Sequence, residues 1–356
     1  MRKKATLRDV AQIAGVSTAT VARVLHNNGY VANETRIAVE RAVEQTGYRL
    51  NLLARNLRQQ RTNVIGHILY AIAPNPFYAQ VALGVEQEAF SHGYSVLAFN
   101  VQGHPERERI GVETLIARQV DAILFTTPAA ASNVQLALDS GRPVVQVERP
   151  TGVRTSCVLV DNYAGSVMAV EHLIELGHNA IAFIGASYRH DLSKASQLVD
   201  ERRHIGYLDT MHKHGIPVQD RWVRLGRHYS IEGRGSPGDG YRFTGEFLDA
   251  PVRPTAIFGS SDFLAAGAYQ AIYERGLRIP QDISVVGYDD TLGEYLAPPL
   301  TTVAQPMSEI GAVACRLAIM ELANGSTGTH EVHVRSLSVQ WVGRASTGPA
   351  PTPVES

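Results

Sequence analysis

The sequence of 356 residues is poor in cysteine and contains no long apolar run. Its two cysteines, Cys157 and Cys315, are too few for a disulfide framework, which favours a reducing cytoplasm. No stretch of about 18 apolar residues occurs, so we expect no transmembrane helix and no membrane partner. The first residues, MRKKATLRDV, are basic but lack the apolar segment and cleavage site of a signal peptide, so we expect a cytoplasmic protein.

The sequence also lacks the motifs of common enzymes and metal sites. It contains no phosphate-binding loop, no nucleophile elbow and no zinc-binding HExxH pair, and its 13 histidines are scattered. We therefore expect no metal, no cofactor and no catalytic residue. The run Gly233–Gly238 (GRGSPG) matches a dinucleotide-binding pattern by letter, but it lacks the preceding strand and the following helix that such a site needs. We interpret residues 233–240 as an inserted flexible loop.

Charge is divided unevenly along the chain, although the net charge is only −1. Residues 1–61 hold eleven Lys or Arg and four acidic residues, whereas the remainder holds 22 basic and 30 acidic residues. A basic end on an acidic body is typical of a protein whose one end meets the phosphate backbone of a nucleic acid. The alternative is a basic end that is merely solvated.

The first 49 residues have the pattern of three short helices. Thr6 opens a capping box at the start of the first helix. Gly15 suits the end of that helix, and Ser17 suits the N-cap of the second. A third helix is expected from about residue 33 to residue 45. Two helices joined by a tight turn that contains glycine, within a basic segment, predict a helix-turn-helix domain over residues 1–49.

From residue 64 onward, short β-rich runs alternate with amphipathic helical stretches, which predicts α/β structure with doubly wound parallel sheets. The number of runs fits two lobes better than one sheet, so we expect a two-lobed domain over residues 62–345. The predicted strands are 64–70, 95–101, 121–127, 143–148, 157–161, 180–185, 255–259 and 283–288. Typical predicted helices are 79–91, 163–176, 202–214, 263–275 and 307–323. The tail 346–356 is rich in Pro, Gly, Ser and Thr, and we expect it to be disordered.

Six motifs occur along the chain: TLRDVAQIAGVSTATVARVLHNNGYVANETRIAVERAVEQTGY from residue 6, ARNLRQQRTNVIG from residue 54, NPFY from residue 75, VDNYAG from residue 160, HLIELGHNAIAFIG from residue 172 and ISVVGYDD from residue 283. In this order they resemble the LacI/GalR family of transcription regulators. The resemblance covers residues 6 to about 345. It implies an all-α helix-turn-helix head, a two-lobed body like that of periplasmic sugar-binding proteins, and a homodimer that binds a near-palindromic double-stranded DNA operator.

In this family the second helix enters the major groove of DNA. Thr18, Ala19 and Arg23 lie opposite the apolar Val21 and Val24 of that helix, so they can face the bases. Arg23 suits two hydrogen bonds to a guanine, with a phosphate contact as the alternative. The further DNA-binding candidates in the head are Thr6, Ser17, Thr20 and His26, with His26 standing where the family usually has Asn and Ala22 where it usually has a phosphate-binding Ser.

Residues 50–61 resemble the hinge helix of the family. A helix this short is marginal alone because nucleation is costly, so we expect it to order only against DNA and a partner hinge. In the family, paired leucines of a dimer wedge between base steps in the minor groove; Leu57 is the matching residue, and Arg55 lies near it. An ordinary linker helix with Leu57 buried on the body is the alternative. Leu50 replaces the Pro that usually precedes this helix.

The resemblance also places a ligand at the carboxyl ends of the strands, in the crevice between the lobes. Arg203 matches a ligand-binding arginine of the family, and Asp289 matches an acid that accepts hydrogen bonds from ligand hydroxyls. The further candidates are Phe77, Tyr78, Glu148, Tyr229, Ser261 and Asp262. Phe77 and Tyr78 suit stacking on a sugar or a base, or simple packing at the hinge. Asp262 suits a helix cap as well as a ligand contact.

These features predict a sequence-specific DNA-binding regulator, a repressor by expectation, that a small ligand controls allosterically. An arginine, an aspartate and aromatic rings suit a carbohydrate effector, and they also admit a purine or nucleoside. Release of DNA on ligand binding is the commoner behaviour in the family and the one we expect, with promotion of DNA binding left open. The rival hypotheses are a small-ligand-binding protein without operator function and an α/β enzyme with an appended DNA-binding head.

Overall fold

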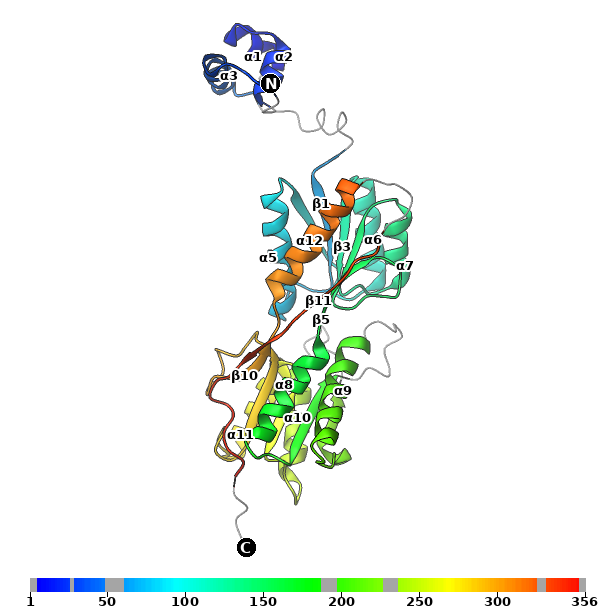
Figure 1. Ribbon diagram of the computed structural model, residues 1–356, viewed down its shortest axis with the longest axis vertical. Coiled ribbons are helices and arrows are strands. Elements are labelled where there is room, and N and C mark those ends of the chain that lie inside the picture. Colours follow the sequence, from blue (N-terminus) through cyan, green and yellow to red (C-terminus); the bar gives the residue numbers. More distant parts are fainter. Residues whose placement is uncertain are drawn as a thin grey trace. The chain divides into compact units, whose positions relative to one another are not determined.

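The computed structural model divides into two compact units, Met1–Thr62 and Asn63–Ser356 (Figure 1). The structure describes residues 5–25, 29–48, 61–186, 197–226, 236–324 and 331–351. The predicted hinge helix over 50–61 therefore lies outside the described residues except for its last position.

The first unit contains three short helices, α1 (Leu7–Ala14), α2 (Thr18–Leu25) and α3 (Asn33–Thr46). Thr6 and Asp9 form the predicted capping box, and Gly15 ends α1 in the left-handed region with a φ of 66°. Val10, Val21 and Val39, one from each helix, are fully buried and make the centre of a small core. The helix-turn-helix head that the sequence predicts is confirmed.

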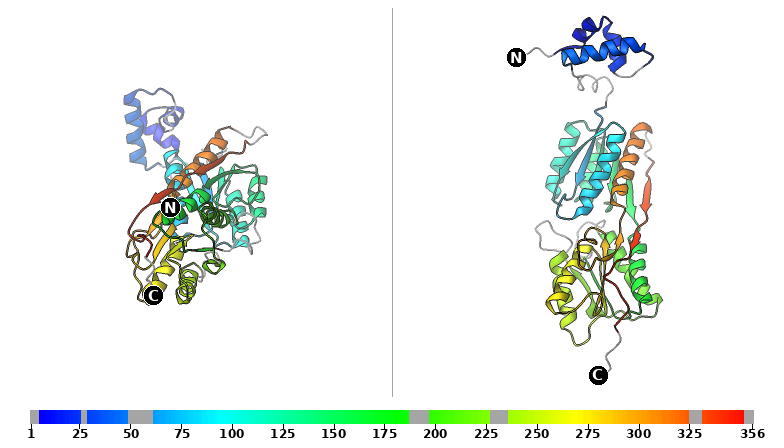
Figure 2. Two further views of the ribbon diagram at one scale, coloured as in Figure 1. Left: turned by 60° about the horizontal axis from the view of Figure 1, so that its bottom comes forward. Right: turned by 90° about the vertical axis from the view of Figure 1, so that its left-hand side faces the viewer.

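The second unit has two lobes, each built on a six-stranded sheet (Figures 1 and 2). In lobe 1 the strand order is β11-β5-β4-β3-β1-β2, and every pair is parallel. The strands are β1 (Val64–Leu69), β2 (Ser95–Asn100), β3 (Ala122–Thr126), β4 (Val144–Val147), β5 (Ser156–Val160) and β11 (Val334–Leu337). The helices are α5 (Pro76–Ser91), α6 (Pro105–Ala117), α7 (Ala131–Asp139) and α12 (Met307–Asn324).

Lobe 2 repeats this design with the strand order β12-β10-β9-β8-β6-β7. All its pairs are parallel except β10 with β12. The strands are β6 (Ile181–Ala186), β7 (Val223–Gly226), β8 (Ala256–Gly259), β9 (Ser284–Asp289), β10 (Thr301–Ala304) and β12 (Gln340–Val342). The helices are α8 (Asn162–Glu175), α9 (Gln197–Lys213), α10 (Ser236–Asp249) and α11 (Asp262–Glu274), with a 3₁₀ turn at Asp220–Trp222.

The chain passes between the lobes three times, from β5 to α8, from β10 to α12 and from β11 to β12 (Figure 2). Three neighbouring crossings leave the lobes free to open and close about them, as in hinge-bending proteins. The central strands of both sheets are covered on both faces, which explains their continuous Val, Ile, Leu and Phe content. The predicted two lobes with parallel sheets are confirmed.

Helices α5 and α12 pack together so closely on lobe 1 that glycine is required at their contact. A Cβ atom at Gly311 would lie 2.0 Å from the carbonyl oxygen of Val81, and one at Gly84 would lie 1.9 Å from that of Ser308. Because α12 directly follows the second crossing, this contact ties the hinge to the body of lobe 1.

The interpretation of residues 233–240 as a flexible loop is wrong for the part that the structure describes. The helix α10 begins at Ser236 and includes Gly240. A Cβ atom at Gly240 would lie 2.1 Å from the carbonyl oxygen of Leu264, so glycine here allows α10 to pack against α11. The sequence contains the glycines that suggest a loop, but the packing partner that requires one of them lies in a distant segment.

The prediction of a disordered tail over 346–356 is wrong for residues 346–351. Ser346 is fully buried; its Oγ donates to the carbonyl of Val285 at 2.6 Å and accepts from the backbone N–H of Thr301 at 2.8 Å. The backbone N–H of Ala350 donates to the carbonyl of Leu176 at 2.9 Å. The two-lobed domain therefore extends past residue 345, because short polar side chains in the tail complete hydrogen bonds of the lobe 2 sheet.

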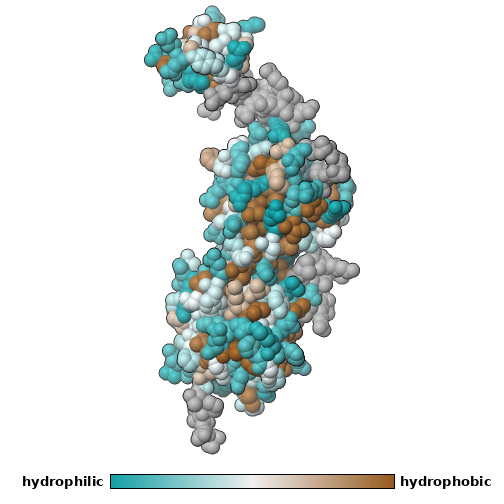
Figure 3. Space-filling model, viewed as in Figure 1, coloured by the Kyte–Doolittle hydropathy of each residue, from teal (hydrophilic) through white to brown (hydrophobic). Residues whose placement is uncertain are grey.

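Hydrophilic side chains cover much of the viewed face of both lobes, with apolar ones gathered along the middle of lobe 1 (Figure 3). Within the part of the chain that the structure describes, no helix is long and apolar enough to cross a membrane.

The substitution Ser346→Ala tests the role of the tail. It removes both hydrogen bonds of the Ser346 hydroxyl and leaves buried backbone groups of Val285 and Thr301 without that partner. We expect the free energy of unfolding to fall by about 1–3 kcal/mol, measured by chemical and thermal denaturation. Ser91→Ala removes an exposed hydroxyl that binds a helix carbonyl and serves as the control. Equal stability of the two variants would contradict a structural tail.

Candidate functional site

The exposed face of α2 is the candidate nucleic-acid surface of the first unit. Thr18, Ala19 and Arg23 are exposed, whereas Val21 and Val24 are buried on the opposite side. A helix with an arginine and short side chains on its free face can enter a major groove and reach base edges.

Three hydroxyls beside this surface are held by local hydrogen bonds. The Oγ of Ser17 accepts from the backbone N–H of Thr20 at 3.1 Å and lies 2.9 Å from the Thr20 hydroxyl. The Thr6 hydroxyl donates to the Asp9 carboxylate at 2.8 Å. These contacts fix the hydroxyls in place, and their use in binding DNA remains a prediction. The other DNA-binding candidates, His26, Arg55 and Leu57, lie outside the described residues.

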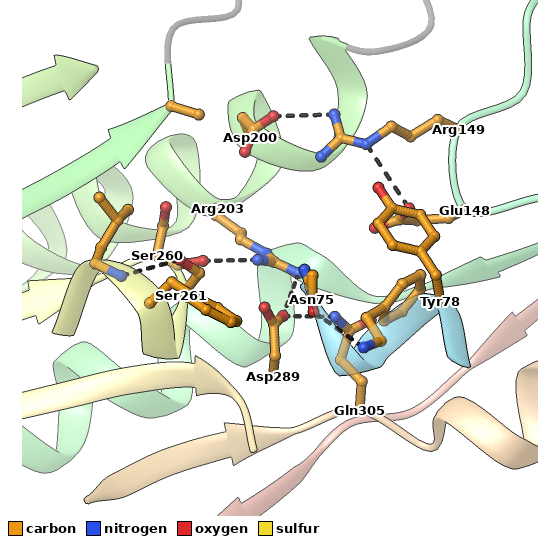
Figure 4. Close-up of a pocket in the computed structure, with 14 residues that line it drawn as sticks. Asn75, Tyr78, Glu148, Arg149, Asp200, Arg203, Ser260, Ser261, Asp289 and Gln305 are labelled. Carbon is orange, nitrogen blue, oxygen red and sulfur yellow. Dashed lines mark hydrogen bonds and ion pairs between the residues drawn. The ribbon is translucent and has the colours of Figure 1, made fainter. Parts of the chain in front are cut away.

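In the second unit, polar side chains converge on a crevice between the two lobes (Figure 4). The crevice contains about 550 Å³ of empty space, its open mouth included. Its polar lining comes from segments that follow the carboxyl ends of strands, which is where doubly wound sheets bind ligands. Lobe 1 contributes Asn75, Tyr78, Glu148 and Arg149, and lobe 2 with its crossing contributes Asp200, Arg203, Ser260, Ser261, Asp289 and Gln305.

Arg203 lies at the centre of this lining and is fixed by four contacts. Its Nε donates to Asn162 at 2.8 Å, and its Nη1 donates to the carbonyl of Ser260 at 2.6 Å. Its Nη2 lies 3.2 Å from an Asp289 oxygen, and the guanidinium stacks 3.7 Å from the centre of the Tyr288 ring. A guanidinium has five N–H groups, so two still have no partner among these contacts and can serve a ligand.

Asp289, at the end of β9, is the partner of Arg203 and also accepts a hydrogen bond from Gln305 at 2.7 Å. Burial raises the pKa of Asp289 to about 6, against the opposing effects of Arg203 and Gln305. Its φ is 103°, in the left-handed region that side chains other than glycine rarely adopt. Strained backbone of this kind is typical of binding sites, where the surrounding structure holds it in place.

A second ion pair spans the crevice from lobe to lobe. Arg149, which follows β4, donates from Nη1 to Asp200 of α9 at 2.9 Å, and both side chains are at least nine-tenths buried. Glu148 also has a positive φ, of 68°, and its carboxylate accepts from the Thr127 hydroxyl at 2.6 Å. The same carboxylate lies 3.8 Å from the Nε of Arg149.

The predicted aromatic residues also lie at the crevice. Phe77 and Tyr78 are nearly buried and meet edge to face, with ring centres 5.3 Å apart. Tyr78 in turn stacks on Tyr70 at 5.6 Å. Burial, with Glu148 nearby, raises the pKa of Tyr78 well above its ordinary value, so its hydroxyl stays protonated and can donate. Phe77 and Tyr78 therefore pack against each other and also line the crevice, and their stacking on a ligand remains a prediction.

Of the two adjacent candidates at the start of α11, only Ser261 lines the crevice. Ser261 is also the N-cap, because its Oγ accepts from the backbone N–H of Leu264. Asp262 points away into lobe 2, which contradicts both predictions for it, the ligand contact and the cap. Its carboxylate accepts from Thr302 and from the backbone N–H groups of Thr291 and Leu292. The Asp262 carboxylate therefore acts inside lobe 2, where its hydrogen bonds hold the loop that follows β9.

Five polar residues of the lining are not among the predicted site residues: Asn75, Arg149, Asp200, Ser260 and Gln305. Ser260 directly follows the predicted strand 255–259. Asn75 and Arg149 follow recognisable strands, and Asp200 lies one helical turn before Arg203, so position alone offered a signal for these three. Gln305 follows β10, a four-residue strand that the sequence pattern did not reveal. Tyr229 lies outside the described residues.

The chemistry of this lining suits hydroxyl groups. It offers two guanidiniums and three carboxylates together with amides and hydroxyls, so donors and acceptors alternate without an excess of positive charge. Among the described residues, no group of three or more His, Cys, Asp or Glu side chains is placed to hold a metal ion.

Comparisons with known families cover both units. A model described as "Bacterial regulatory proteins, lacI family" matches residues 6–51, and one described as "Periplasmic binding protein-like domain" matches residues 170–347. The chain is 34% identical to the ribose operon repressor of Escherichia coli K12, over 88% of this chain and 92% of the relative. It is 33% identical to the HTH-type transcriptional repressor PurR of Actinobacillus pleuropneumoniae, over 88% of this chain and 90% of that relative.

Solved structures are similar over nearly the whole chain. The lac repressor dimer bound to operator and the anti-inducer ONPF aligns with a TM-score of 0.80 at 28% identity, covering 97% of this chain and 100% of the other. A complex of the transcriptional regulator CelR with cellobiose aligns with a TM-score of 0.68 at 29% identity, covering 96% of this chain and 99% of the other.

The substitution Asp262→Asn tests the internal role of this carboxyl. Burial, with Asp289 nearby, raises the pKa of Asp262 from 3.8 to about 7, so folding favours the protonated form. The wild-type protein therefore loses stability as the pH rises from about 4 to about 7, and the variant, which cannot ionise, does not. We therefore expect the stability of the variant relative to that of the wild-type protein to increase by about 1–3 kcal/mol between pH 4 and pH 8, measured by urea denaturation at both pH values. Parallel pH profiles would contradict this account.

Proposed function

This chain belongs to the lacI family of bacterial regulatory proteins, and we propose that it is a repressor whose effector is a small uncharged sugar bound in the crevice. The family supplies the general activity, which is sequence-specific DNA binding by a homodimer under the control of a small ligand. The observation that carries the proposal of a sugar is the lining of the crevice, above all the fixed pair of Arg203 and Asp289.

A sugar hydroxyl both donates and accepts hydrogen bonds, and the pair offers both functions side by side. The unused N–H groups of Arg203 donate, and the carboxylate of Asp289 accepts. Because both groups are held by other contacts before a ligand arrives, little ordering is needed on binding. The lining carries no net positive charge, so a phosphorylated sugar would meet Glu148, Asp200 and Asp289 without enough compensation.

The names of the relatives are consistent with this choice. The ribose operon repressor is named for a pentose, and the CelR complex contains a disaccharide. A purine base or nucleoside is the second candidate, favoured by the aromatic rings of Phe77, Tyr78 and Phe263 at the crevice, which suit stacking on a flat ring.

Control of DNA binding follows from the two-lobed architecture. A ligand that contacts both lobes stabilises one degree of closure, and the three crossings let the lobes adopt it. In a dimer, a change in closure alters the spacing of the segments that lead to the DNA-binding heads. We propose that the sugar favours the state that releases DNA. A differential affinity of about 100-fold between the two states corresponds to about 2.7 kcal/mol of coupling.

The effector is tested first by a thermal-shift screen of pentoses, hexoses, purine bases and nucleosides, because a ligand that binds the native state raises the melting temperature. The hit is then titrated against the protein bound to its operator, which is selected beforehand from a random duplex library. Release of DNA by a sugar supports the proposal, whereas release by a purine alone overturns the sugar assignment.

The substitution Asp289→Asn tests the site. It replaces one carboxylate oxygen, which accepts hydrogen bonds, with an amide nitrogen, which only donates them, and it removes the negative charge that pairs with Arg203. We expect the effector to bind at least about tenfold more weakly, measured by calorimetry, while operator binding persists. Asp282→Asn removes a carboxylate of the same kind from an exposed pair with Arg278 and is the control. Equal effector affinity in both variants would show that Asp289 does not contact the effector.

The substitution Arg23→Ala tests the reading face of α2. We expect operator affinity to fall by about 1–3 kcal/mol, with a smaller loss on random DNA, so that the specificity ratio narrows. Arg41→Ala removes the same charge from the exposed side of α3 and should weaken both kinds of binding alike. The measurement is a fluorescence-anisotropy titration at two salt concentrations. An unchanged specificity ratio in Arg23→Ala would exclude a base contact.

A further inference from the structure

The ion pair of Arg149 and Asp200 crosses the crevice and joins a side chain of lobe 1 to one of lobe 2 (Figure 4). Arg149 follows β4 of lobe 1, and Asp200 lies in the first turn of α9 of lobe 2. The Nη1 to Oδ2 distance is 2.9 Å, and the two side chains are only 5% and 9% exposed. This buried ion pair therefore links lobe 1 to lobe 2 at the first turn of α9.

The pair lies across the crevice from the hinge. Figure 4 shows Arg149 and Asp200 along one edge, and Asp289 with Gln305 along the other. Arg203 and Tyr78 lie between these edges. Because Gln305 belongs to the second crossing between the lobes, the ion pair bounds the crevice on the side away from that crossing. The distance between these two edges therefore limits the length of a ligand that binds between them.

Arg149 is held in place from its own lobe. The Glu148 carboxylate lies 3.8 Å from its Nε, and that carboxylate is fixed by the Thr127 hydroxyl at 2.6 Å. Thr127 and Glu148 both have a positive φ, of 55° and 68°. Strain that persists at two neighbouring strand ends indicates a conformation that the surrounding contacts impose, and Arg149 directly follows one of these two residues.

We propose that the Arg149–Asp200 ion pair is a size gate that limits the effector to a single sugar ring. This inference rests on the proposed sugar function of the same crevice. The fold itself does not impose such a limit, because a regulator of similar fold is found in complex with cellobiose. The side chains that close the crevice therefore set the limit. A second sugar ring would have to separate the two residues of a buried ion pair, which would leave two buried charges without their counter-ions.

The test compares each monosaccharide with the disaccharide built from it: xylose with xylobiose, glucose with cellobiose, and galactose with lactose, with ribose as an additional single ring. Binding is measured by calorimetry on the full chain. The variant is Arg149→Ala/Asp200→Ala, because removal of one partner alone would leave a buried charge without its counter-ion, whereas removal of both avoids that cost. The control, Arg278→Ala/Asp282→Ala, removes an exposed ion pair of lobe 2.

In the wild-type protein and the control, we expect a single ring to bind at least about 100-fold more tightly than the matching disaccharide. In Arg149→Ala/Asp200→Ala, we expect this ratio to fall to about tenfold or less, chiefly because the disaccharide binds more tightly. Circular dichroism and the melting temperature of the ligand-free variant establish that it is folded.

Several outcomes overturn the gate. The wild-type protein binds a disaccharide as well as its single ring, or the folded double variant keeps the wild-type ratio, and in either case the proposed sugar function stands. If no sugar binds any of the proteins, the proposed function fails and the gate fails with it. If the double variant does not fold, Arg149→Gln/Asp200→Asn keeps the side-chain size and removes the charges; an unchanged ratio in that variant likewise overturns a gate that depends on the ion pair.

Discussion

The buried pair of Arg203 and Asp289 is the interaction on which the rest of the site depends. A guanidinium deep in a protein is costly unless its N–H groups are satisfied, and here the partners come from three elements of lobe 2: Asn162 at the start of α8, the carbonyl of Ser260 after β8, and Asp289 at the end of β9. Gln305 extends this network to the crossing toward lobe 1. The floor of the crevice is therefore rigid and already oriented before any ligand binds.

The opposite edge of the crevice has a different character. Arg149 and Asp200 belong to different lobes, so their contact exists only at one degree of closure, whereas the contacts of Arg203 persist as lobe 2 moves. A ligand shifts the equilibrium between the open and closed lobes only through contacts that it makes in one of these states and not in the other. The Arg203 network supplies contacts that are present in both states, and the edge formed by Arg149 and Asp200 supplies contacts that depend on closure. The close packing of α5 with α12 then makes lobe 1 move as one body.

Much of this could be predicted from the sequence, and the rest fails for physical reasons. Buried central strands give continuous apolar runs, so the two lobes were predictable, and Arg203 and Asp289 stand within long motifs of the family. The cross-lobe contact of Asp200 depends on closure, which no local pattern encodes. Ser346 stands in a tail whose composition suggests disorder, but its hydrogen-bond partners are distant in sequence. Asp262 shows the converse error, because a good helix-capping residue at a helix start is used instead inside the lobe.

In the proposed regulator the crevice and the DNA-binding heads are coupled, and coupling between two binding sites is reciprocal. The most direct test measures the dissociation constant of the effector sugar with and without saturating operator, and that of the operator with and without saturating sugar. The account predicts that operator weakens sugar binding by at least about fivefold, and that sugar weakens operator binding by the same factor. A sugar affinity that is identical on free and operator-bound protein would contradict it.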